Sequence, residues 1–273
     1  MTDLSINPEL VSGILVDFIR DEVLKVGARG VVVAISGGID SALSAQLAVT
    51  ALGAGAVTGL ALPYRESTPS SLEDGQLVAA QLGIELMVIE ISPQIDAYFS
   101  KFPDADPTRR GNKLARERMS VLYDISATRS ALVLGTSNKS ELLLGYSTLW
   151  GDGAHALNPL GDLYKTQLYQ LARHLGLPQR ILDKPPSADL FVGQSDEVDL
   201  GFTYEQADRI LFRLIDERRS PAELAEQGLD PALVAVVWER VRSSQFKRRL
   251  PLIAKLSGRS IGQDFRYPRD WGY

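Results

Sequence analysis

The stretch Ile35-Ser36-Gly37-Gly38-Ile39-Asp40-Ser41 decides the fold. An apolar, β-branched run at 31–35 leads into it, and an apolar run at 42–49 with the composition of a helix follows. The first run predicts a strand that is buried on both faces, because it shows no alternation of polar and apolar residues. A polar glycine turn between a strand and a helix start presents free backbone N–H groups and the positive end of the helix dipole. The stretch therefore predicts an anion site that suits phosphate.

The side chains of the turn support this interpretation. Gly37 and Gly38 let the backbone approach a phosphate closely, and Ser36 and Ser41 add hydroxyl donors. Asp40 would repel phosphate unless a cation lay between them, which indicates Mg²⁺. No Lys follows the glycines as in a Walker A loop, and the spacing is not that of a dinucleotide-binding fingerprint. The simpler alternative is a tight Gly-Gly turn in which Ser and Asp are ordinary helix caps.

Composition narrows the possible functions. The chain has 273 residues, 45% of them hydrophobic, a net charge of −5 and a pI near 5.2. It therefore has no overall positive charge to attract nucleic acid. The absence of cysteine from the sequence excludes disulfides, thiolate catalysis and Cys-ligated zinc. We see neither a signal-peptide pattern at the start nor an apolar run long enough to cross a bilayer, and we expect a cytoplasmic protein.

Strands and helices alternate along the chain. This order predicts an α/β fold, a doubly wound parallel sheet with helices on both faces of the Rossmann-like (adenine nucleotide alpha hydrolase-like) type. We expect a single domain over residues 1–273, because no composition break marks a boundary. Ligands in such sheets bind beyond the carboxyl ends of the strands. The expected strands are 31–35, 56–62, 85–91 and 131–135, and the main expected helices are 7–26, 42–49, 72–83, 111–128, 165–176, 203–218 and 231–247.

A second polar turn, 135–141, follows the fourth expected strand. Thr136 is placed to cap the next helix, and Glu141 follows within about one and a half turns. Glu141 and Asp40 would together offer two hard oxygen ligands to Mg²⁺. The alternative is a helix cap with an exposed Glu. Farther along, the segment 183–201 is longer than an ordinary connection and is expected to be a flexible lid, and 248–273 is expected to be a C-terminal tail.

The sequence Ser-Gly-Gly-x-Asp-Ser after a first buried strand resembles the pyrophosphate-binding loop of the N-type ATP pyrophosphatases. Within that superfamily, a series of further motifs resembles the NAD synthetases. The similarity runs from about Ile14 to Pro251, nearly the whole chain. The motifs are Gly-Asn-x-x-Ala-Arg-x-Arg-Met at 111–119, Leu-Gly-Thr-Ser-Asn-Lys-Ser-Glu at 134–141, Leu-Tyr-Lys-Thr-Gln at 163–167, Pro-Ser-Ala-Asp-Leu at 186–190 and Gln-Ser-Asp-Glu at 194–197.

The resemblance implies a role for individual residues. Asp40 and Glu141 would ligate Mg²⁺, and Asp40 and Lys165 would be catalytic. Arg116 and Lys247 would contact deamido-NAD⁺. The implied ATP-binding residues are Ser36, Gly37, Gly38, Ile39, Asp40, Ser41, Thr136, Lys165 and Ser187.

Each residue outside the first turn also has a simpler interpretation. Arg116 lies on a charged helix face that solvent alone would explain, and Lys247 lies in a Lys-Arg-Arg cluster. Ser187, after two prolines, would cap a turn. Lys165 differs from these, because a cation at a helix start opposes the helix dipole, and a phosphate partner would explain its position.

The sequence departs from the family pattern where the nicotinate end of the substrate would bind. Many members carry Lys and Asp at positions that align here with Leu149 and Ala156, next to His155, and a His where Phe246 stands. The residues that recognise nicotinate are therefore not transferable from the family. We interpret the difference as variation within it.

The reaction implied by the resemblance is the ATP-dependent amidation of deamido-NAD⁺ through an acyl-adenylate, giving NAD⁺, AMP and pyrophosphate. Because glutamine amidotransferase domains in this family use a cysteine nucleophile and the sequence has none, ammonia is the expected nitrogen donor. A homodimer is also expected. The alternatives are another ATP pyrophosphatase, GMP synthetase-like or tRNA-modifying, and a nucleotide-binding sensor without catalysis.

Overall fold

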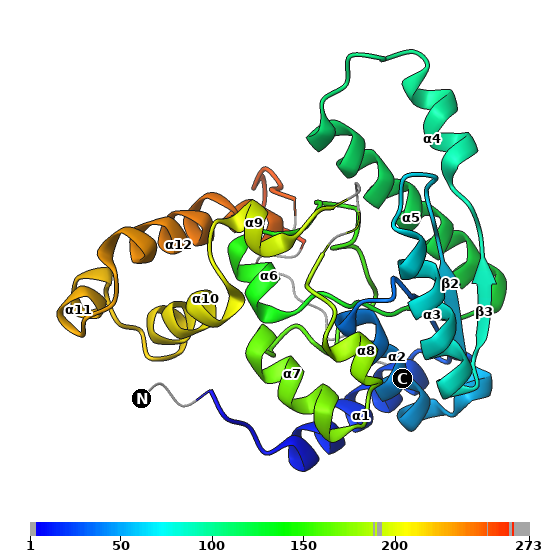
Figure 1. Cartoon of the computed structure of the whole chain (residues 1–273), viewed down its shortest axis with the longest axis horizontal. Coiled ribbons are helices and arrows are strands. Elements are labelled where there is room, and N and C mark those ends of the chain that lie inside the picture. The colour runs from blue at the N-terminus through cyan, green and yellow to red at the C-terminus, as the bar shows by residue number, and fades with distance from the viewer. Residues whose placement is uncertain (1–3, 188, 190–192, 250, 262–263, 265–273) are drawn as a thin grey trace.

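A parallel four-stranded sheet is the framework of the computed structural model, which describes residues 4–187, 189, 193–249, 251–261 and 264. The sheet lies toward the right of Figure 1. The strands are β1 (Val31–Ala34), β2 (Val57–Ala61), β3 (Glu85–Val88) and β4 (Leu132–Val133). Their order is β3-β2-β1-β4, and every pairing is parallel. The chain therefore builds the sheet outward from β1 in one direction and then returns to place β4 on its other side. This reversal creates a topological switch point between β1 and β4.

Strand β1 shows why the sheet is buried on both faces. Val31 and Val33 belong to one apolar cluster, which includes side chains of α1, α2 and α7. Val32 belongs to a second cluster on the opposite face, where α4 and α5 supply Ile95 and Leu122. A strand covered by helices on both faces requires the continuous apolar sequence that this segment has. The predicted doubly wound α/β fold is confirmed.

The helices connect the strands and extend beyond them. A third apolar cluster joins α6 to α10, α11 and α12, which gather on the side of α6 and α7 that is away from the sheet (Figure 1). Whether residues 1–273 form a single domain stays a prediction. The helices are α1 (Pro8–Lys25), α2 (Ile39–Leu52), α3 (Pro69–Leu82), α4 (Ser92–Phe99), α5 (Pro107–Arg129), α6 (Lys139–Leu144), α7 (Lys165–His174), α8 (Gln179–Leu182), α9 (Asp196–Leu200), α10 (Tyr204–Leu211), α11 (Pro221–Glu226) and α12 (Pro231–Ser243).

Shorter helical turns complete the architecture. A 3₁₀ turn, η1 (Ala54–Ala56), precedes β2, and another, η3 (Gln245–Arg248), follows α12. The helix α10 continues into a π-helical segment, η2 (Phe212–Asp216). Leu134 forms an isolated parallel bridge with Leu157, so the chain after β4 adds one more position to the edge of the sheet.

Several predicted boundaries were wrong. The helix after β4 is capped by Asn138 and not by Thr136, since the Asn138 side chain accepts from the backbone N–H of Glu141 and the Glu141 side chain accepts from that of Asn138. The helix expected from 111 begins at Pro107, because the Asp106 side chain accepts from Arg109 N. The expected loop 183–201 contains α9, and its residues 188 and 190–192 lie outside the described residues.

In the expected tail, 248–273, residues 250, 262–263 and 265–273 lie outside the described part of the chain. Among the helices that the structure describes, none combines the length and the apolar character needed to span a membrane.

Candidate active site

The two polar turns predicted from the sequence meet at the switch point between β1 and β4. Asp40 lies in the first turn of α2, directly after the turn that follows β1, and Asn138 caps α6 in the turn that follows β4. The Asn138 Nδ2 donates to Asp40 Oδ1 at 2.8 Å. A second bond joins α2 to the turn after β4, because Ser44 Oγ donates to the Gly135 carbonyl at 3.1 Å. The carboxyl ends of β1 and β4 therefore converge at one place, as the topology requires.

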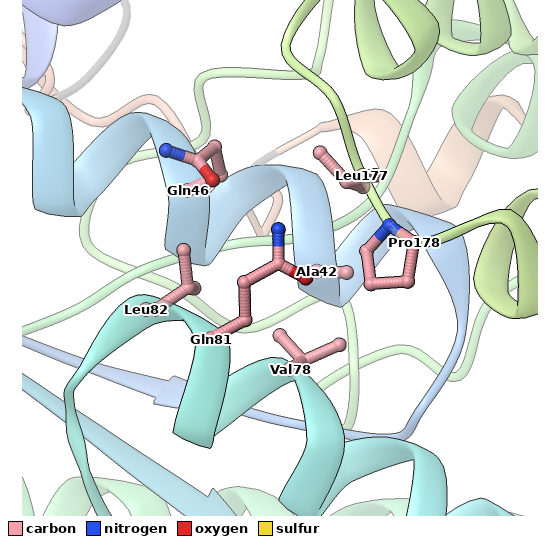
Figure 2. A pocket seen from close by; sticks show the side chains of 7 residues that line it. All are labelled: Ala42, Gln46, Val78, Gln81, Leu82, Leu177 and Pro178. Carbon is pink, nitrogen blue, oxygen red and sulfur yellow. The ribbon is translucent and has the colours of Figure 1, made fainter.

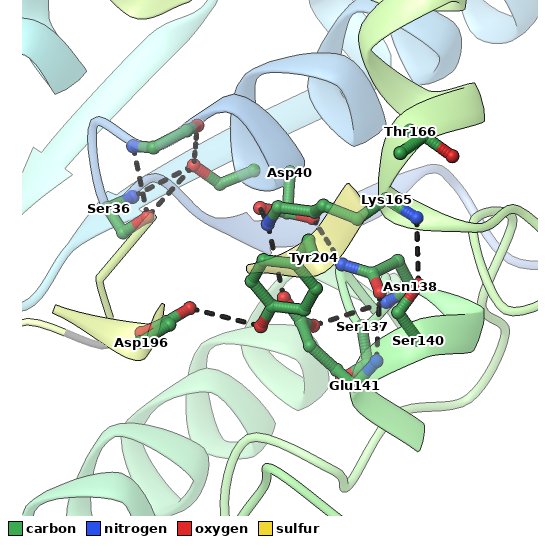
Figure 3. A network of polar contacts seen from close by, with 12 residues as sticks. Ser36, Asp40, Ser137, Asn138, Ser140, Glu141, Lys165, Thr166, Asp196 and Tyr204 are labelled. Atoms are coloured by element: carbon green, nitrogen blue, oxygen red, sulfur yellow. Dashed lines mark hydrogen bonds and ion pairs between the residues drawn. The ribbon is translucent and has the colours of Figure 1, made fainter. Parts of the chain in front are cut away.

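Lys165 joins both turns to a third element. It is the first residue of α7, and its side chain is 2% exposed. Its Nζ donates to Asp40 Oδ2 at 2.6 Å and to Glu141 Oε1 at 3.2 Å (Figure 3). A buried ammonium at a helix N-terminus is unfavourable by itself, both through desolvation and through the helix dipole. The two carboxylates offset both costs, which accounts for the unusual position of this lysine.

The backbone at the start of α7 is held by a buried carboxylate that the sequence analysis missed. Ser140 Oγ accepts from Lys165 N at 2.9 Å and donates to Asp208 Oδ1, whose other oxygen accepts from Thr166 N at 2.8 Å. Burial raises the pKa of Asp208. Asp208, on the distant helix α10, therefore caps one N–H group of the helix start directly and a second one through Ser140, and no local sequence pattern predicts this arrangement.

An aromatic side chain forms another wall of the site. The Lys165 Nζ lies 5.2 Å from the centroid of the Tyr204 ring, a cation–π distance. The Tyr204 hydroxyl donates to Asp196 Oδ2 at 3.2 Å. A cavity of about 190 Å³ lies beside this group and is lined by Lys165, Thr166, Tyr169, Pro186, Glu197, Tyr204 and Glu205. Tyr204 is the first residue of α10, and Asp196 is the first residue of α9, so the C-terminal part of the segment 183–201 contacts the Lys165 site through Tyr204.

The electrostatics of the cluster favour an additional cation. Burial, reinforced by the neighbouring Asp40 carboxylate, raises the pKa of Glu141, although Lys165 opposes this shift. Burial alone would lower the pKa of Lys165, but Asp40 and Glu141 outweigh it and raise that pKa above its ordinary value. Burial also raises the pKa of Asp196. One ammonium therefore faces three carboxyl groups, and bound positive charge would relieve their repulsion.

The two carboxylates of Asp40 and Glu141 suit Mg²⁺, and they are too few for a metal ion whose ligands all come from the protein. Asp40 and Glu141 direct one oxygen each at the same point, which Lys165 Nζ occupies. In the described part of the chain, no three His, Cys, Asp or Glu side chains are arranged to hold a metal. Mg²⁺ commonly takes one or two carboxylates and completes its shell with water and substrate phosphates. The two carboxylates suit such an ion, which would require Lys165 to move or to share them.

The predicted phosphate loop has the expected backbone. Gly37 has φ +75, a left-handed conformation that favours glycine. Gly38 is the N-cap of α2 and has no side chain to cap the first turn of the helix, so the N–H groups there keep their capacity to bind an anion. Ser36 and Ser41 hydrogen bond to each other through their hydroxyls at 3.1 Å, and Ser41 Oγ donates to the Gly38 carbonyl at 3.0 Å. The serines shape the loop in this conformation.

The structure does not bring all the predicted ATP-binding residues into this cluster. Thr136 is half-buried in the turn after β4, two residues before the cap Asn138. Ser187 is exposed, and its hydroxyl accepts from Asp189 N at 3.1 Å, the local turn contact that was the simpler interpretation. Its role in binding ATP stays a prediction.

The two residues predicted to bind deamido-NAD⁺ act on one segment. Lys247 Nζ donates to the carbonyls of Gly145 and Ser147 at 2.7 and 2.6 Å, and burial lowers its pKa. Arg116 Nε donates to the carbonyl of Leu149 at 3.2 Å. Both cations therefore hydrogen bond to backbone carbonyls of the irregular segment 145–149, although they lie 131 positions apart in the sequence. Their contact with a substrate stays a prediction.

The residues at the positions that depart from the family pattern differ in their burial. The His155 ring packs against Gly135, where an added Cβ would lie 2.7 Å from the ring. Its Nδ1 is buried with no hydrogen-bond partner among the described residues, and burial lowers its pKa. Leu149 is half-buried, whereas Ala156 and Phe246 are exposed.

A hollow elsewhere on the sheet does not compete with this site. Figure 2 shows it between α2, α3 and the chain before α8, lined mostly by apolar side chains such as Ala42, Val78 and Leu82. Its volume is about 10 Å³, which is close to the minimum for a single water molecule. The hollow is a packing feature between two helices.

The sequence matches a known protein family over most of its length. The sequence model described as NAD synthase matches residues 11–251. The chain belongs to the NAD synthase family. It is 54% identical to the NH(3)-dependent NAD(+) synthetase of Trichlorobacter lovleyi over the full length of both chains. It is 52% identical to that of Chlorobaculum parvum, covering 98% of this chain and 97% of the relative. The chain is therefore an enzyme of the ligase class.

Solved structures of the NAD synthase family share the fold. An NH3-dependent NAD synthetase from Campylobacter jejuni, in complex with the nitrate ion, superposes with a TM-score of 0.80 at 37% identity, covering 92% of this chain and 100% of that one. The NMN synthetase of Francisella tularensis gives 0.82 at 33% identity, covering 92% and 99%. A glutamine-dependent NAD+ synthetase from Acinetobacter baumannii gives 0.70 at 30% identity and covers 97% of this chain but only 50% of that one.

Proposed function

We propose that the chain amidates deamido-NAD⁺ with ammonia and ATP, giving NAD⁺, AMP and pyrophosphate through an acyl-adenylate. The observation that carries the proposal is the meeting of Asp40, Glu141 and Lys165 beside an uncapped helix start. The named relatives at about half identity support the choice of substrates. A nucleotide sensor would need the phosphate loop but not two carboxylates and a buried lysine.

The phosphate loop holds the leaving group in this proposal. The β- and γ-phosphates of ATP lie against the N–H groups of residues 37–41, and Ser36 and Ser41 turn their hydroxyls toward them. The deamido-NAD⁺ carboxylate attacks the α-phosphorus, and the bond from that atom to the bridging oxygen breaks. Negative charge develops on pyrophosphate, where backbone donors and Lys165 stabilise it. Residues Ile39 and Thr136 contact the nucleotide from the ends of the two strands.

Asp40 and Glu141 hold Mg²⁺ in this proposal, and the ion supplies charge neutralisation on the phosphate oxygens when it is bound. Lys165 then leaves one or both carboxylates and turns toward the phosphates. Its ammonium is buried, so in this proposal it would exchange one anionic partner for another. Asn138 keeps Asp40 in orientation through its bond to Oδ1.

Ammonia attacks the acyl carbon in the second step, AMP leaves, and the nitrogen releases a proton to solvent. The adenylate needs protection from water, because hydrolysis would waste it. The segment 183–201 is the proposed lid, and Ser187 would reach the phosphates when the lid closes. Arg116 and Lys247 would contact deamido-NAD⁺ at the segment 145–149. A homodimer is the proposed assembly, and neither nucleic acid nor a membrane takes part.

The test is a complete reaction with the purified chain. Incubation with Mg-ATP, deamido-NAD⁺ and ammonium should give NAD⁺ and AMP in equal amounts, and deamido-NAD⁺ labelled with heavy oxygen in its carboxylate should pass one label to AMP. Parallel reactions replace ammonium by glutamine, and deamido-NAD⁺ by nicotinate mononucleotide. Higher kcat/KM on the mononucleotide would reassign the substrate. Pyrophosphate release only with another acceptor, or ATP binding without turnover, would contradict the proposal.

A further inference from the structure

Lys184 lies beneath the phosphate loop, at the start of the segment 183–201, and has no assigned role. Its Nζ donates to Asp74 Oδ2 at 2.8 Å, to Ser71 Oγ at 3.2 Å and to the carbonyl oxygen of Gly37 at 3.3 Å. The three acceptors come from α3 and from the phosphate loop. One side chain thus links the predicted lid, the helix behind the loop and the loop itself.

The carboxylate that holds Lys184 is buried. Asp74 is 2% exposed, and its second oxygen lies 2.5 Å from Arg180 Nε. Arg180 also pairs with Glu73 at 3.0 Å and is half exposed. Two cations therefore share one buried carboxylate, as a buried charge requires. Among the described residues, Lys184 hydrogen bonds to the phosphate loop, whereas Arg180 forms ion pairs with Glu73 and Asp74 only.

The helix that carries Asp74 forms the back of the loop. A Cβ on Gly37 would lie 2.3 Å from the Ser71 carbonyl oxygen and 2.8 Å from Asp74 Cβ, so the backbone of Gly37 presses against α3. Asp189 Oδ1 accepts at 3.2 Å from the backbone N–H of Thr68, the N-cap of α3. The start of the segment 183–201 therefore contacts α3 at its N-cap and at Ser71 and Asp74, the residues against which the loop rests.

The hydrogen bond from Lys184 to the Gly37 carbonyl affects the orientation of the whole Gly37–Gly38 peptide. The peptide between Gly37 and Gly38 is planar and trans, so its N–H points away from its C=O. A cation that holds the Gly37 oxygen against α3 thereby directs the Gly38 N–H to the opposite side. It also polarises the peptide and makes that N–H a stronger donor. Glycine residues do not resist rotation of this peptide, so its contacts set its orientation. Lys184 holds its oxygen, and Ser36 Oγ accepts from the Gly38 N–H at 3.3 Å in the structure.

We propose that Lys184 is a positioning residue for ATP, which orients the Gly37–Gly38 peptide of the phosphate loop through the Gly37 carbonyl. It does not touch the phosphates. This inference rests on the proposed role of the loop in binding ATP. Because Lys184 belongs to the predicted lid, a movement of the lid would change this contact and with it the conformation of the phosphate loop.

The test compares three variants of the full chain. Lys184→Met keeps the length of the side chain and removes the charge, Arg180→Gln removes the other cation of Asp74, and Lys184→Arg restores a donor. Calorimetry measures the affinity for Mg-ATP and for inorganic pyrophosphate, and steady-state kinetics separate the KM values. We expect about tenfold weaker binding of both ligands in Lys184→Met, since the charge-assisted hydrogen bond to the Gly37 carbonyl of the phosphate loop is lost. The KM for deamido-NAD⁺ should stay within about twofold.

The controls separate positioning from simple stability. Arg180→Gln should bind ATP within about twofold of wild type, and Lys184→Arg should recover most of the affinity. Equal losses in Lys184→Met and Arg180→Gln would overturn the proposal, since Asp74 would then be what matters. Unchanged ATP affinity in Lys184→Met, or equal rises in both KM values with a lower Tm, would also overturn it.

The measurements keep this inference distinct from the proposed reaction. A wild-type chain that binds ATP and forms no NAD⁺ contradicts the reaction, while the ratio of ATP affinities still decides the role of Lys184. A wild-type chain that binds neither ATP nor pyrophosphate overturns both.

Discussion

Lys165 Nζ lies 2.6 Å from Asp40 Oδ2, although 125 positions separate the two residues in the sequence. The pair joins the helix after β1 to the first residue of α7, and Glu141 completes it from the turn after β4. The site therefore depends on three segments that the order of strands brings together. Each member of this group compensates for a cost of another: the ammonium neutralises two crowded carboxylates, and they stabilise a charge that would otherwise be buried alone.

Asp40→Asn tests the charge of the group. The amide keeps the shape of the side chain but supplies neither a metal ligand of full charge nor a partner for Lys165, so kcat should fall by at least about a hundredfold. Far-ultraviolet circular dichroism should be unchanged. Asp17→Asn, at an exposed position on α1, is the control and should keep full activity. Unchanged turnover in Asp40→Asn would remove Asp40 from the site.

Lys165→Met tests whether the two carboxylates can bind a cation directly. Removing the ammonium leaves Asp40 and Glu141 facing each other, and stability should fall by about 2 kcal/mol, less than for a fully buried pair because both carboxylates retain some exposure. Mg²⁺ without ATP should then raise the Tm of the variant more than that of the wild type, as the ion takes the vacated position. Equal Mg²⁺ responses of the two proteins would contradict this assignment of the metal ligands.

The sequence predicted the centre of this site and missed what supports it. Asp40, Glu141 and Lys165 were predictable because polar residues after parallel strands share one edge, and because a lysine at a helix start needs an anion. Asn138 has a local signal, because Asn-x-x-Glu is the pattern of a capping box, and this pattern and not the hydroxyl of Thr136 marks the start of α6. Asp208 and Asp74 had no such signal. Each is an ordinary helix residue whose partner comes from a distant element.

The same distinction holds for the fold. Strands and long helices were predicted well, because their apolar pattern repeats over many residues. The short helices α8, α9 and α11 were not predicted, since each has six residues or fewer and its hydrophobic face is too short to show a period. The start of α5 was placed too late, because its first turn is polar and only the Asp106 cap and Pro107 mark it.

Gly37→Ala tests the close contact between the phosphate loop and α3. An added Cβ at Gly37 meets the Ser71 carbonyl, and the left-handed backbone at this position adds strain of about 1 kcal/mol or more. Affinity for ATP and thermal stability should both fall. Gly55→Ala is the matched control, because nothing lies within 4 Å of its Cβ position and its φ is ordinary. Equal behaviour of the two variants would contradict the packing described for the loop.

Asp208 predicts a dependence of stability on pH. Burial raises the pKa of its carboxyl above the value of 3.8 expected in an unfolded chain. The folded state therefore holds more protons than the unfolded state as the pH rises above about 4, so this group contributes less stability at higher pH. Asp208→Asn removes the titration. The difference in unfolding free energy, wild type minus variant, should fall from pH 4 to pH 7 in urea titrations, and a rising difference would show that hydrogen bonds dominate over burial.

Lys247→Met tests the segment 145–149 as the binding site of deamido-NAD⁺. The lysine donates to two carbonyls of this segment, at 2.7 and 2.6 Å, and Arg116 donates to a third. Losing one of these cations should make the proposed substrate-binding segment less ordered. The phosphate loop should be unaffected, because neither cation contacts it in the described structure. The KM for deamido-NAD⁺ should rise about tenfold while the KM for ATP stays within about twofold. Arg242→Gln, an exposed change on the neighbouring helix, should leave both values unchanged. A rise in the KM for ATP alone would instead show that Lys247 supports the binding of ATP and not that of deamido-NAD⁺.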